Sequence, residues 1–569
     1  MRTMTADYSQ TNQARACLSS LQEQVDNGFL HLNKLCTVAG IFQSSELDAH
    51  QKVSYELAFC VAEIQASKAM LDYSDKFSSQ DKLCEALSLT FTADVLTTVW
   101  QRLFNHSIEA GLLKNDLISL LNSEEFDGFI TKNGGVDQFS EIGNKINEWG
   151  NLNIRPHLML PSGLDEEKDM VRKSFASFTD KVVMPLAEQI HRKDEDVPDE
   201  IIKAAADMGC FGTCIPEKFG GLMPNDKNDS LGMLVVTEEL SRGSLGAAGS
   251  LITRPEIAAR ALLEGGTEEQ KSLWLPRLAT GEYLAAISIT EPDYGSDVAS
   301  LSLKASKTEG GWLLNGSKTW CTFAGKADVI VTIARTHPDK EKGHRGLSMF
   351  LVEKPRFEGH EFNYQNPVSG SIAGKAIPTI GYRGMHSYDL YFEDYFVPEN
   401  ALVGEEKGEN RGFYLTMAGL SGGRIQTAAR ASGVMQAAID KSVDYAKNRK
   451  VFGETVASFQ LTKVKLGKMF LSLTASRQLS YSVARLMDNG EGQMEASLSK
   501  LFSCRAAEWV TREALQIHGG MGYAEESAVS RYFVDARVLS IFEGAEETLA
   551  LKIIARGLIE KANKGNKTS

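Results

Sequence analysis

The chain has 569 residues, and at about 100 to 200 residues per domain it predicts three or four domains, each able to bury a core. Its formal net charge of −13 argues against a sequence-independent grip on nucleic acid or on an anionic membrane surface. Because there is no run of about 18 apolar residues and no N-terminal signal pattern, we expect a cytoplasmic protein without membrane insertion.

Residues 1–160 predict a helical N-terminal extension, since apolar residues such as Val53, Leu57 and Ile64 recur at helical spacing. Part of this extension recurs later in the chain: Gln51, Leu57 and Ala66 match Gln460, Leu466 and Ala475 at one constant spacing, and Leu87 and Phe91 match Leu498 and Phe502 at nearly the same spacing. A degenerate repeat and a chance match of two amphipathic helix pairs both explain this pattern. A true repeat would be structural, because the N-terminal copy lacks the later glycine cluster.

In the rest of the chain the spacing of apolar residues changes from helical to alternating and back to helical. This order predicts an α+β fold. A loop-like stretch at 150–163 marks a boundary, and residues 161–284 then predict a second helical domain. Residues 285–400 alternate between apolar and polar and predict a middle β domain, with Asn315-Gly316 as a hairpin turn. Residues 401–569 predict a C-terminal helical bundle, in which Gly422-Gly423 lies near a helix start.

The eight cysteines are scattered and form no C-x-x-C pair. This spacing favours reduced thiols in the core over disulfides, and it gives no reason to expect a metal site.

A carboxylate near the C-terminus is the candidate for proton transfer. Glu543 follows the apolar Ile541 and Phe542 and precedes Gly544, so burial at this turn would raise its pKa towards the range of a general base. A solvated loop carboxylate is the plainer interpretation. Upstream, Gly519, Gly520 and Gly522 would let a ligand approach the backbone closely.

Together with Gln516, Glu526, Arg531 and Asp535, these glycines resemble the C-terminal signature of the acyl-CoA dehydrogenase family. The resemblance covers about residues 165–565 and implies the family's fold: a helical domain, a middle β domain and a C-terminal helical bundle, here preceded by the extension. It implies that Glu543 is the catalytic base and that Gln516, Gly519 and Gly520 bind the cofactor FAD. Some relatives carry the base one residue before the arginine that matches Arg424, but Gly423 stands there in this chain.

A second motif lies at 288–297 and resembles the family's first signature, which implies that Ile289, Thr290 and Ser296 bind the flavin. Trp320 and Thr322 match residues that cover one face of the flavin ring. Without the resemblance, the motif at 288–297 is interpreted as a turn, and Trp320 is interpreted as a half-buried aromatic residue in a strand. Ser288 and Tyr294 depart from the family pattern.

A third motif, Arg449 and Phe452 followed by Gln460, resembles the residues that reach the FAD of a neighbouring subunit. A guanidinium suits a pyrophosphate because its fork matches two phosphate oxygens. The resemblance therefore implies a homo-oligomer. At the family's adenine-side turn Ala545 and Glu547 replace a hydroxyl and an amide, which departs from the family pattern at that end of the cofactor.

The resemblance implies a reaction in which an acyl-CoA substrate is dehydrogenated between its α and β carbons and an electron-transfer flavoprotein takes the electrons. Ser296, Arg424 and Gly544 would bind the substrate. Many relatives are tetramers, but an added helical domain that resembles the C-terminal one could cover a dimer's outer face, so we expect a dimer.

The chain is similar to a branch of the family that has a dicarboxylic substrate. The similarity lies in three features: the long extension, an insertion at 362–378 and Tyr294. A second buried carboxylate needs a partner. Relatives with such a substrate use an arginine where Ala248 stands here, so we take Arg254, six residues later, as the candidate, with Tyr294 and Arg383 as alternatives.

Other functions fit the same sequence. The substrate could be another short branched or dicarboxylic acyl-CoA, or the chain could be an acyl-CoA oxidase or flavin monooxygenase. A non-catalytic interaction protein is a third class, against which the presence of Glu543 argues.

Overall fold

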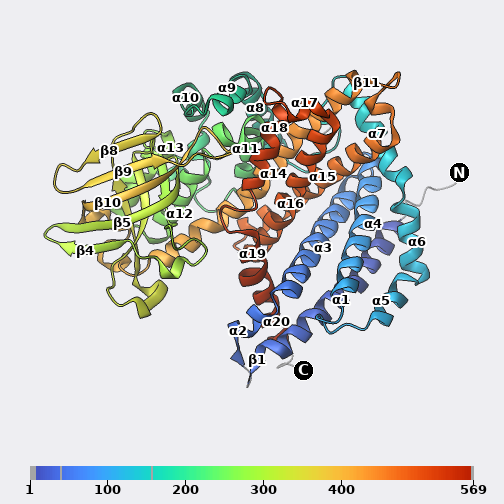
Figure 1. Ribbon diagram of the computed structural model, residues 1–569, viewed down its shortest axis with the longest axis horizontal. Coiled ribbons are helices and arrows are strands. Elements are labelled where there is room, and N and C mark those ends of the chain that lie inside the picture. The colour runs from blue at the N-terminus through green and yellow to red at the C-terminus, as the bar shows by residue number, and fades with distance from the viewer. Residues whose placement is uncertain (1–7, 39–40, 156–157, 566–569) are drawn as a thin grey trace. The chain divides into compact units, whose positions relative to one another are not determined.

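The computed structural model of the protein describes residues 8–38, 41–155 and 158–565 (Figure 1). The chain divides into two compact units. Unit 1 comprises Met1–Asp169, Met435–Ala484 and Gly492–Ser569, and unit 2 comprises Met170–Val434 and Arg485–Glu491. The N-terminal extension therefore shares one unit with most of the C-terminal helices.

Unit 1 is built from helices. The extension supplies α1 (Tyr8–Cys36), α2 (Ser44–Ala49), α3 (Gln51–Phe77), α4 (Lys82–Asn105), α5 (Lys114–Leu121), α6 (Glu124–Asn133) and α7 (Val136–Asn151), with a short strand pair, β1 (Thr37–Val38) and β2 (Ile41–Phe42). The C-terminal part supplies most of α15 (Gln460–Asp488), then α16 (Gln493–His518), α17 (Gly520–Tyr523), α18 (Ala528–Val538), α19 (Glu546–Thr548) and α20 (Arg556–Gly565), with the hairpin β11 (Lys450–Val451) and β12 (Glu454–Thr455).

The helix bounds support the internal repeat. Helix α3 begins at Gln51 and its counterpart α15 at Gln460, while α4 begins at Lys82 and its counterpart α16 at Gln493. The two pairs face each other within unit 1 (Figure 1). Phe91 of α4 packs against its own counterpart, Phe502 of α16, with the ring centroids 5.9 Å apart. The packing of a residue against its equivalent is the mark of a two-fold arrangement.

Two further contacts occupy equivalent places on either side of this pseudo-axis. Lys468 of α15 forms an ion pair of 2.9 Å with Asp94 of α4. At the matching positions, the guanidinium of Arg505 of α16 lies over the Phe59 ring of α3, 3.8 Å from its centroid. The same geometry therefore holds an ion pair on one side and a cation–π contact on the other.

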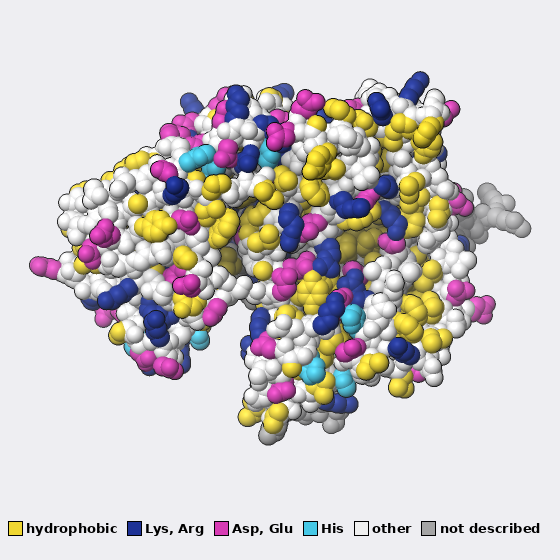
Figure 2. Space-filling view, in the orientation of Figure 1, with side chains coloured by type: hydrophobic (Ala, Val, Ile, Leu, Met, Phe, Trp, Pro, Cys, Tyr) yellow, Lys and Arg dark blue, Asp and Glu magenta, His cyan; other side chains and the backbone are white. Residues whose placement is uncertain are grey.

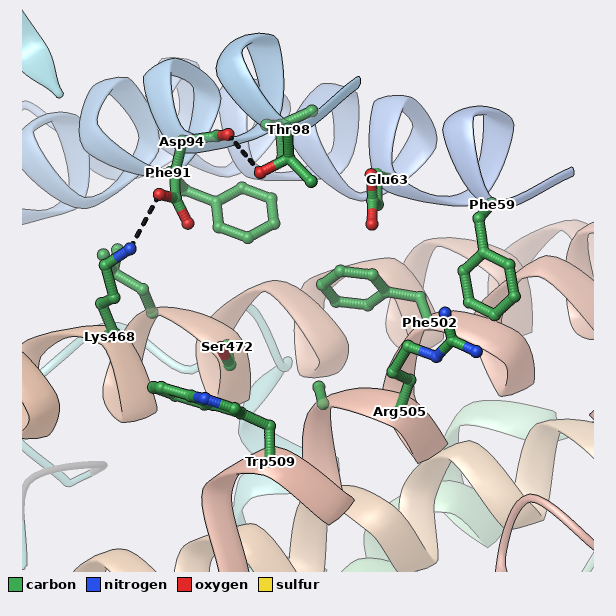
Figure 3. Close-up of a pocket in the computed structure, with 13 residues that line it drawn as sticks. Phe59, Glu63, Phe91, Asp94, Thr98, Lys468, Ser472, Phe502, Arg505 and Trp509 are labelled. Atoms are coloured by element: carbon green, nitrogen blue, oxygen red, sulfur yellow. Dashed lines mark hydrogen bonds and ion pairs between the residues drawn. The ribbon is translucent and has the colours of Figure 1, made fainter. Parts of the chain in front are cut away.

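A cavity of about 490 Å³ lies between the two helix pairs (Figure 3). Its lining includes Phe59, Phe91, Phe502 and Trp509, and the carboxyl group of Glu63 also faces it. Burial raises the pKa of Glu63 to about 7, although the cations Arg102 and Arg505 favour its charged form.

Close helix crossing fixes the extension against α15. A Cβ added at Gly143 of α7 would lie 2.1 Å from the carbonyl oxygen of Lys463, and one added at Gly467 of α15 would lie 2.3 Å from that of Phe139. Because no side chain stands between them, the two backbones can approach this closely. The amide of Asn147 adds a hydrogen bond of 3.1 Å to Ala457 O.

Unit 2 contains α9 (Met184–Lys193), α10 (Asp199–Asp207), α11 (Ser230–Gly243), α12 (Thr253–Gly265), α13 (Glu268–Thr280) and most of α8 (Glu166–Phe178), followed by the β domain. The strands are β3 (Ala285–Ser288), β4 (Lys304–Thr308), β5 (Gly311–Thr322), β6 (Val329–Arg335), β7 (Leu347–Glu353), β8 (Glu361–Gln365), β9 (Ser371–Ala376) and β10 (Ser387–Pro398). They form one sheet in the order β3-β6-β4-β5-β10-β9-β8, with β7 on β6 (Figure 1).

Strand β6 shows why this sheet has two cores. Val329, Val331 and Ile333 pack with residues of α12 and α13, whereas Ile330 and Ala334 pack on the opposite face with β5 and β10. Successive side chains of a strand point to opposite faces, so a strand covered on both faces is apolar throughout.

The predicted hairpin turn at Asn315-Gly316 is wrong, because β5 runs through both residues. The turn that leads into β5 follows β4 and contains Gly310, with φ of 74°. Asn315 instead lies beside a register shift in β10, where its amide accepts from Asp394 N and donates to Asp394 Oδ1, both at 2.9 Å. The turn-forming dipeptide thus serves a β-bulge.

All eight cysteines are free and buried, as predicted. Among the described residues no helix is long and apolar enough to cross a membrane. On the face drawn in Figure 2, acidic and basic side chains lie interspersed.

The substitution Gly143→Ala tests the close helix crossing. It forces a methyl group against the Lys463 carbonyl, so we expect the free energy of unfolding to fall by about 1 to 3 kcal/mol. Gly128→Ala in α6 is the matched control, because a Cβ there meets no atom within 4 Å and should stabilise the helix by about 1 kcal/mol. Urea unfolding measures both, and equal effects would contradict the crossing.

Candidate active site

Glu543 lies in the loop between α18 and α19, which we call the Glu543 loop (540–547). Its φ of 54° places a non-glycine residue in the left-handed region. Such strain persists only where the surroundings enforce it, and it gathers at functional sites. Glu543 is half-buried and Ile541 is exposed. The apolar neighbours therefore enclose Glu543 less than the sequence predicts.

One buried lysine holds the backbone on both sides of Glu543. Lys500 of α16 is 1% exposed, and its ammonium donates to Phe542 O at 2.8 Å and to Gly544 O at 2.5 Å. Hydrogen bonds from a charged donor are stronger than neutral ones, the more so when buried. Lys500 therefore fixes the peptide units that aim the Glu543 side chain.

The N-terminal extension contacts the same loop. Arg505 of α16 donates to Glu546 Oε1 at 2.7 Å, and the hydroxyl of Tyr55 of α3 donates to the same oxygen. Arg505 also donates to the Tyr55 hydroxyl at 2.5 Å. Burial, together with the hydrogen bond to Glu546, raises the pKa of Tyr55 to about 12, so the phenol stays a donor. The extension thus anchors a residue three positions after Glu543.

The expected flavin loop in unit 2 is held by a buried ion pair. Lys318 of β5 donates to Ile289 O at 2.7 Å and to Glu291 Oε1 at 2.9 Å. Burial would raise the pKa of Glu291, but Lys318 and the amide of Leu303 hold it below its usual value. Ile289 and Thr290 are therefore presented on a fixed backbone, while Ser296 at the end of the loop is exposed.

Trp320 and Thr322 lie near the end of β5. Trp320 is 55% exposed and has φ of 58°, so an indole is held out from the strand by strained backbone. Thr322 is buried, and its hydroxyl lies 2.9 Å from that of Ser387. A large exposed aromatic on a rigid strand is suited to stacking on a planar ring.

Arg254 of α12 is 7% exposed. Its guanidinium donates to Ser250 O at 3.3 Å, and within the described part of the chain no carboxylate lies within ion-pair distance of it. It is close enough to Cys321, which stands between Trp320 and Thr322, to lower the pKa of a thiol that burial raises to about 12. A buried cation without an anionic partner is costly, so this site favours an anion from outside the chain.

The other candidates for substrate contact differ from Arg254. Arg383 pairs with Asp194 at 3.4 Å and donates to Thr379 O and His191 O, both at 3.0 Å. Tyr294 exchanges two backbone hydrogen bonds with Glu291 and is half-buried. Arg424 lies inside α14 (Gly412–Asn448) and not near a helix start, because the Gly422-Gly423 pair is accommodated within that long helix.

The residues expected at a subunit boundary are exposed in unit 1. Phe452 is 98% exposed at the turn between β11 and β12, with φ of 52°, and Arg449 and Gln460 on either side of that hairpin are exposed too. Gln516 near the end of α16 and the following Gly519 and Gly520 are likewise exposed. A Cβ added at either glycine would meet no atom within 4 Å, so the backbone there is open to a ligand.

Three family models match this chain: the N-terminal domain of acyl-CoA dehydrogenases at residues 165–282, the middle domain at 286–395 and the C-terminal domain at 410–559. The chain belongs to the acyl-CoA dehydrogenase family, which are FAD-dependent oxidoreductases. The open glycine backbone and the exposed Trp320 fit such a cofactor, and Ile289, Thr290, Trp320 and Arg449 are the residues that we expect to hold it.

Among its relatives, a (2S)-methylsuccinyl-CoA dehydrogenase of Cereibacter sphaeroides is 44% identical over 401 residues, which are 70% of this chain and 71% of that protein. An acyl-CoA dehydrogenase of Bacillus subtilis is 37% identical over 69% of this chain and 98% of its own length. The structure of a glutaryl-CoA dehydrogenase in complex with glutaryl-CoA matches with a TM-score of 0.64 and 29% identity, over 70% of this chain and 98% of that chain.

Four residues at the site were not predicted from the sequence: Lys500, Tyr55, Arg505 and Lys318. Tyr55 lies nearly 500 positions from its partner Glu546, so no local pattern connects them. The only signal for Lys500 is a lysine on the apolar side of a helix, beside Leu501 and Cys504.

The substitution Lys500→Met tests whether this lysine positions Glu543. We expect kcat to fall about 10- to 100-fold with little change in KM, because misplacing a reacting group slows chemistry more than binding. Lys354→Met is the matched control: Lys354 is also buried, and it likewise donates to two backbone carbonyls, Gly325 O and Ala327 O, at 2.8 Å each. Both variants should lose stability, but only Lys500→Met should lose kcat in steady-state assays.

Proposed function

We propose that the chain oxidises (2S)-methylsuccinyl-CoA to mesaconyl-CoA, as in the ethylmalonyl-CoA pathway. The relative that is 44% identical is a (2S)-methylsuccinyl-CoA dehydrogenase, which supports this substrate. The guanidinium of Arg254, which is buried and has no ion-pair partner among the described residues, supports a dicarboxylic acyl group. Arg254 is the single observation that carries the choice, because a monocarboxylic acyl chain would leave this cation without a partner.

In this proposal Glu543 abstracts the α-proton of the thioester. Lys500 and the Tyr55–Arg505–Glu546 contacts keep the Glu543 loop in place, so the carboxylate needs little reorganisation when the proton is transferred. The backbone amide of Glu543 polarises the thioester carbonyl as charge develops on its oxygen. FAD supplies the hydride acceptor for the β-carbon. Ser296, Arg424 and Gly544 bind the rest of the substrate.

The electrons then pass to an electron-transfer flavoprotein. The eight free thiols are consistent with a reducing compartment, and we place the enzyme in the cytoplasm.

Anaerobic bleaching of the flavin by a panel of acyl-CoA thioesters tests the function. We expect (2S)-methylsuccinyl-CoA to bleach the flavin at least about tenfold faster than butyryl-CoA, glutaryl-CoA or the (2R) isomer, since pocket contacts of this kind discriminate by about 1 to 3 kcal/mol. Glu543→Gln should abolish bleaching by every substrate. A faster reaction with butyryl-CoA would exclude the proposed substrate, and rapid reoxidation of the reduced flavin in air would indicate an oxidase.

The variant Arg254→Ala separates recognition of the second carboxylate from the rest of binding. We expect KM for (2S)-methylsuccinyl-CoA to rise about 30-fold or more, because truncating one side of a buried charge pair costs about 2 to 5 kcal/mol. KM for butyryl-CoA should change little. Arg383→Ala serves as the control, since Arg383 is already paired with Asp194. Equal effects of Arg254→Ala on both substrates would remove the assignment.

We also propose that the enzyme is a homodimer. The face of α15 and α16 that carries Phe502, Lys468 and Arg505 is covered by α3 and α4 of the same chain, in a two-fold-like arrangement. A face already covered by an equivalent helix pair is not available to another subunit. The exposed Arg449 and Phe452 remain free to reach the FAD of one partner.

Light scattering on the FAD-loaded enzyme checks this state. The expected mass is near two chains of 62.4 kDa over a wide range of protein concentrations. A mass near four chains would show that the extension does not replace a subunit contact.

A further inference from the structure

Three segments of unit 2 bring two histidines and two carboxylates together, and one of these carboxylates, Asp194, is the ion-pair partner of Arg383. Asp194 and Asp196 lie in the loop after α9, His360 immediately precedes β8, and His386 immediately precedes β10. The sequence gives no sign of this cluster, because nearly 200 positions separate its first and last members.

The ligand atoms are close enough to share one ion. One such atom from each of Asp194, His360 and His386 lies within 4.8 Å of the other two. Nε2 of His386 is 3.2 Å from Oδ1 of Asp194. Two ligands bound at about 2.0 to 2.1 Å to a tetrahedral zinc ion lie roughly 3.3 Å apart, so this pair already has the required separation. The ring of His360 lies 4.3 Å from that of His386, centroid to centroid, and its Nε2–H donates to the backbone oxygen of Asp194 at 3.0 Å, which leaves Nδ1 as the ligand atom of His360.

Asp196 supplies the support that metal-binding histidines normally have. Nδ1 of His386 lies 2.9 Å from Oδ1 of Asp196, and Oδ2 of Asp196 accepts from Gly359 N at 2.6 Å. A ligating histidine usually donates its second ring N–H to a carboxylate, which fixes the tautomer and the orientation of the ring. With Nδ1 occupied in this way, the lone pair of Nε2 points towards Asp194.

The alternative occupant is a proton. Both ring nitrogens of His386 face carboxylates, and although burial would lower its pKa, Asp196 and Asp194 together raise it. Arg383 lies 3.4 Å from Asp194, and Lys326 acts on Asp196 from its ion pairs with Asp199 and Glu358. These cations weaken binding of a second positive charge, and His360 is exposed, so a metal here would exchange with solvent.

We propose that Asp194, His360 and His386 bind a divalent transition-metal ion of the zinc type, with Asp196 as the residue that orients His386. Two imidazoles and one carboxylate form a ligand set that prefers zinc and its neighbours to magnesium or calcium. A water molecule completes the coordination on the exposed side of His360. The ion ties the loop after α9 to the β domain, so its role is structural.

Equilibrium dialysis of the tag-free, FAD-loaded enzyme against Zn²⁺, followed by metal analysis, tests the site. We expect one zinc per chain and a higher melting temperature with zinc, because an ion that binds only the folded state stabilises it by mass action. Mg²⁺ should have neither effect. His360→Ala, an exposed position that should not impair folding, and Asp194→Asn should each abolish both effects, whereas the control His337→Ala should abolish neither.

Less than about one zinc per five chains would overturn the proposal, and so would equal binding by wild type and His360→Ala. In the first case a proton alone occupies the cluster, and in the second the zinc is adventitious. Flavin bleaching by acyl-CoA should be the same with and without zinc, so the result is independent of the proposed reaction.

Discussion

The position of Glu543 depends on one buried ammonium that binds the two carbonyl groups on either side of it. The hydrogen bonds of Lys500 to Phe542 O and Gly544 O help to keep the left-handed backbone of Glu543 in this short loop. Because the ammonium and the carbonyl groups are buried, any of them left without a hydrogen-bond partner would destabilise the folded state. The loop is therefore determined by α16, and α16 by the helices that pack on it, including those of the extension.

This dependence gives the N-terminal extension a role beyond covering a surface. Tyr55 of α3 and Arg505 of α16 meet on Glu546, so the extension and the Glu543 loop share a hydrogen-bonded cluster. The helix-pair packing around Phe91 and Phe502 holds α3 where it can make this contact. The packing of the two helix pairs and the position of the Glu543 loop are thus connected through residues of a single unit.

The sequence predicts much of this and misses the rest for identifiable reasons. Period and family resemblance predict the three family domains, the helical extension and Glu543 itself. The hairpin at Asn315-Gly316 fails because the same dipeptide also serves a bulge within a long strand, and only the register of β10 distinguishes the two. The start of α14 is misplaced because a glycine pair, which favours a helix end, is tolerated inside that helix. Lys500, Tyr55 and the Asp194–His386 pair act through distant partners, which no local pattern reveals.

Because the two helix pairs of the repeat are encoded separately, a residue on one side of the pseudo-axis can change without its counterpart changing. In a contact between identical subunits every substitution appears twice, so both sides of the axis must tolerate the same side chain. Here one gene segment encodes each side, and the counterparts have diverged: Phe59 corresponds to Lys468 and Asp94 to Arg505. An aromatic–guanidinium contact on one side and an ion pair on the other can coexist because the two helix pairs belong to the same polypeptide, where dilution does not separate them.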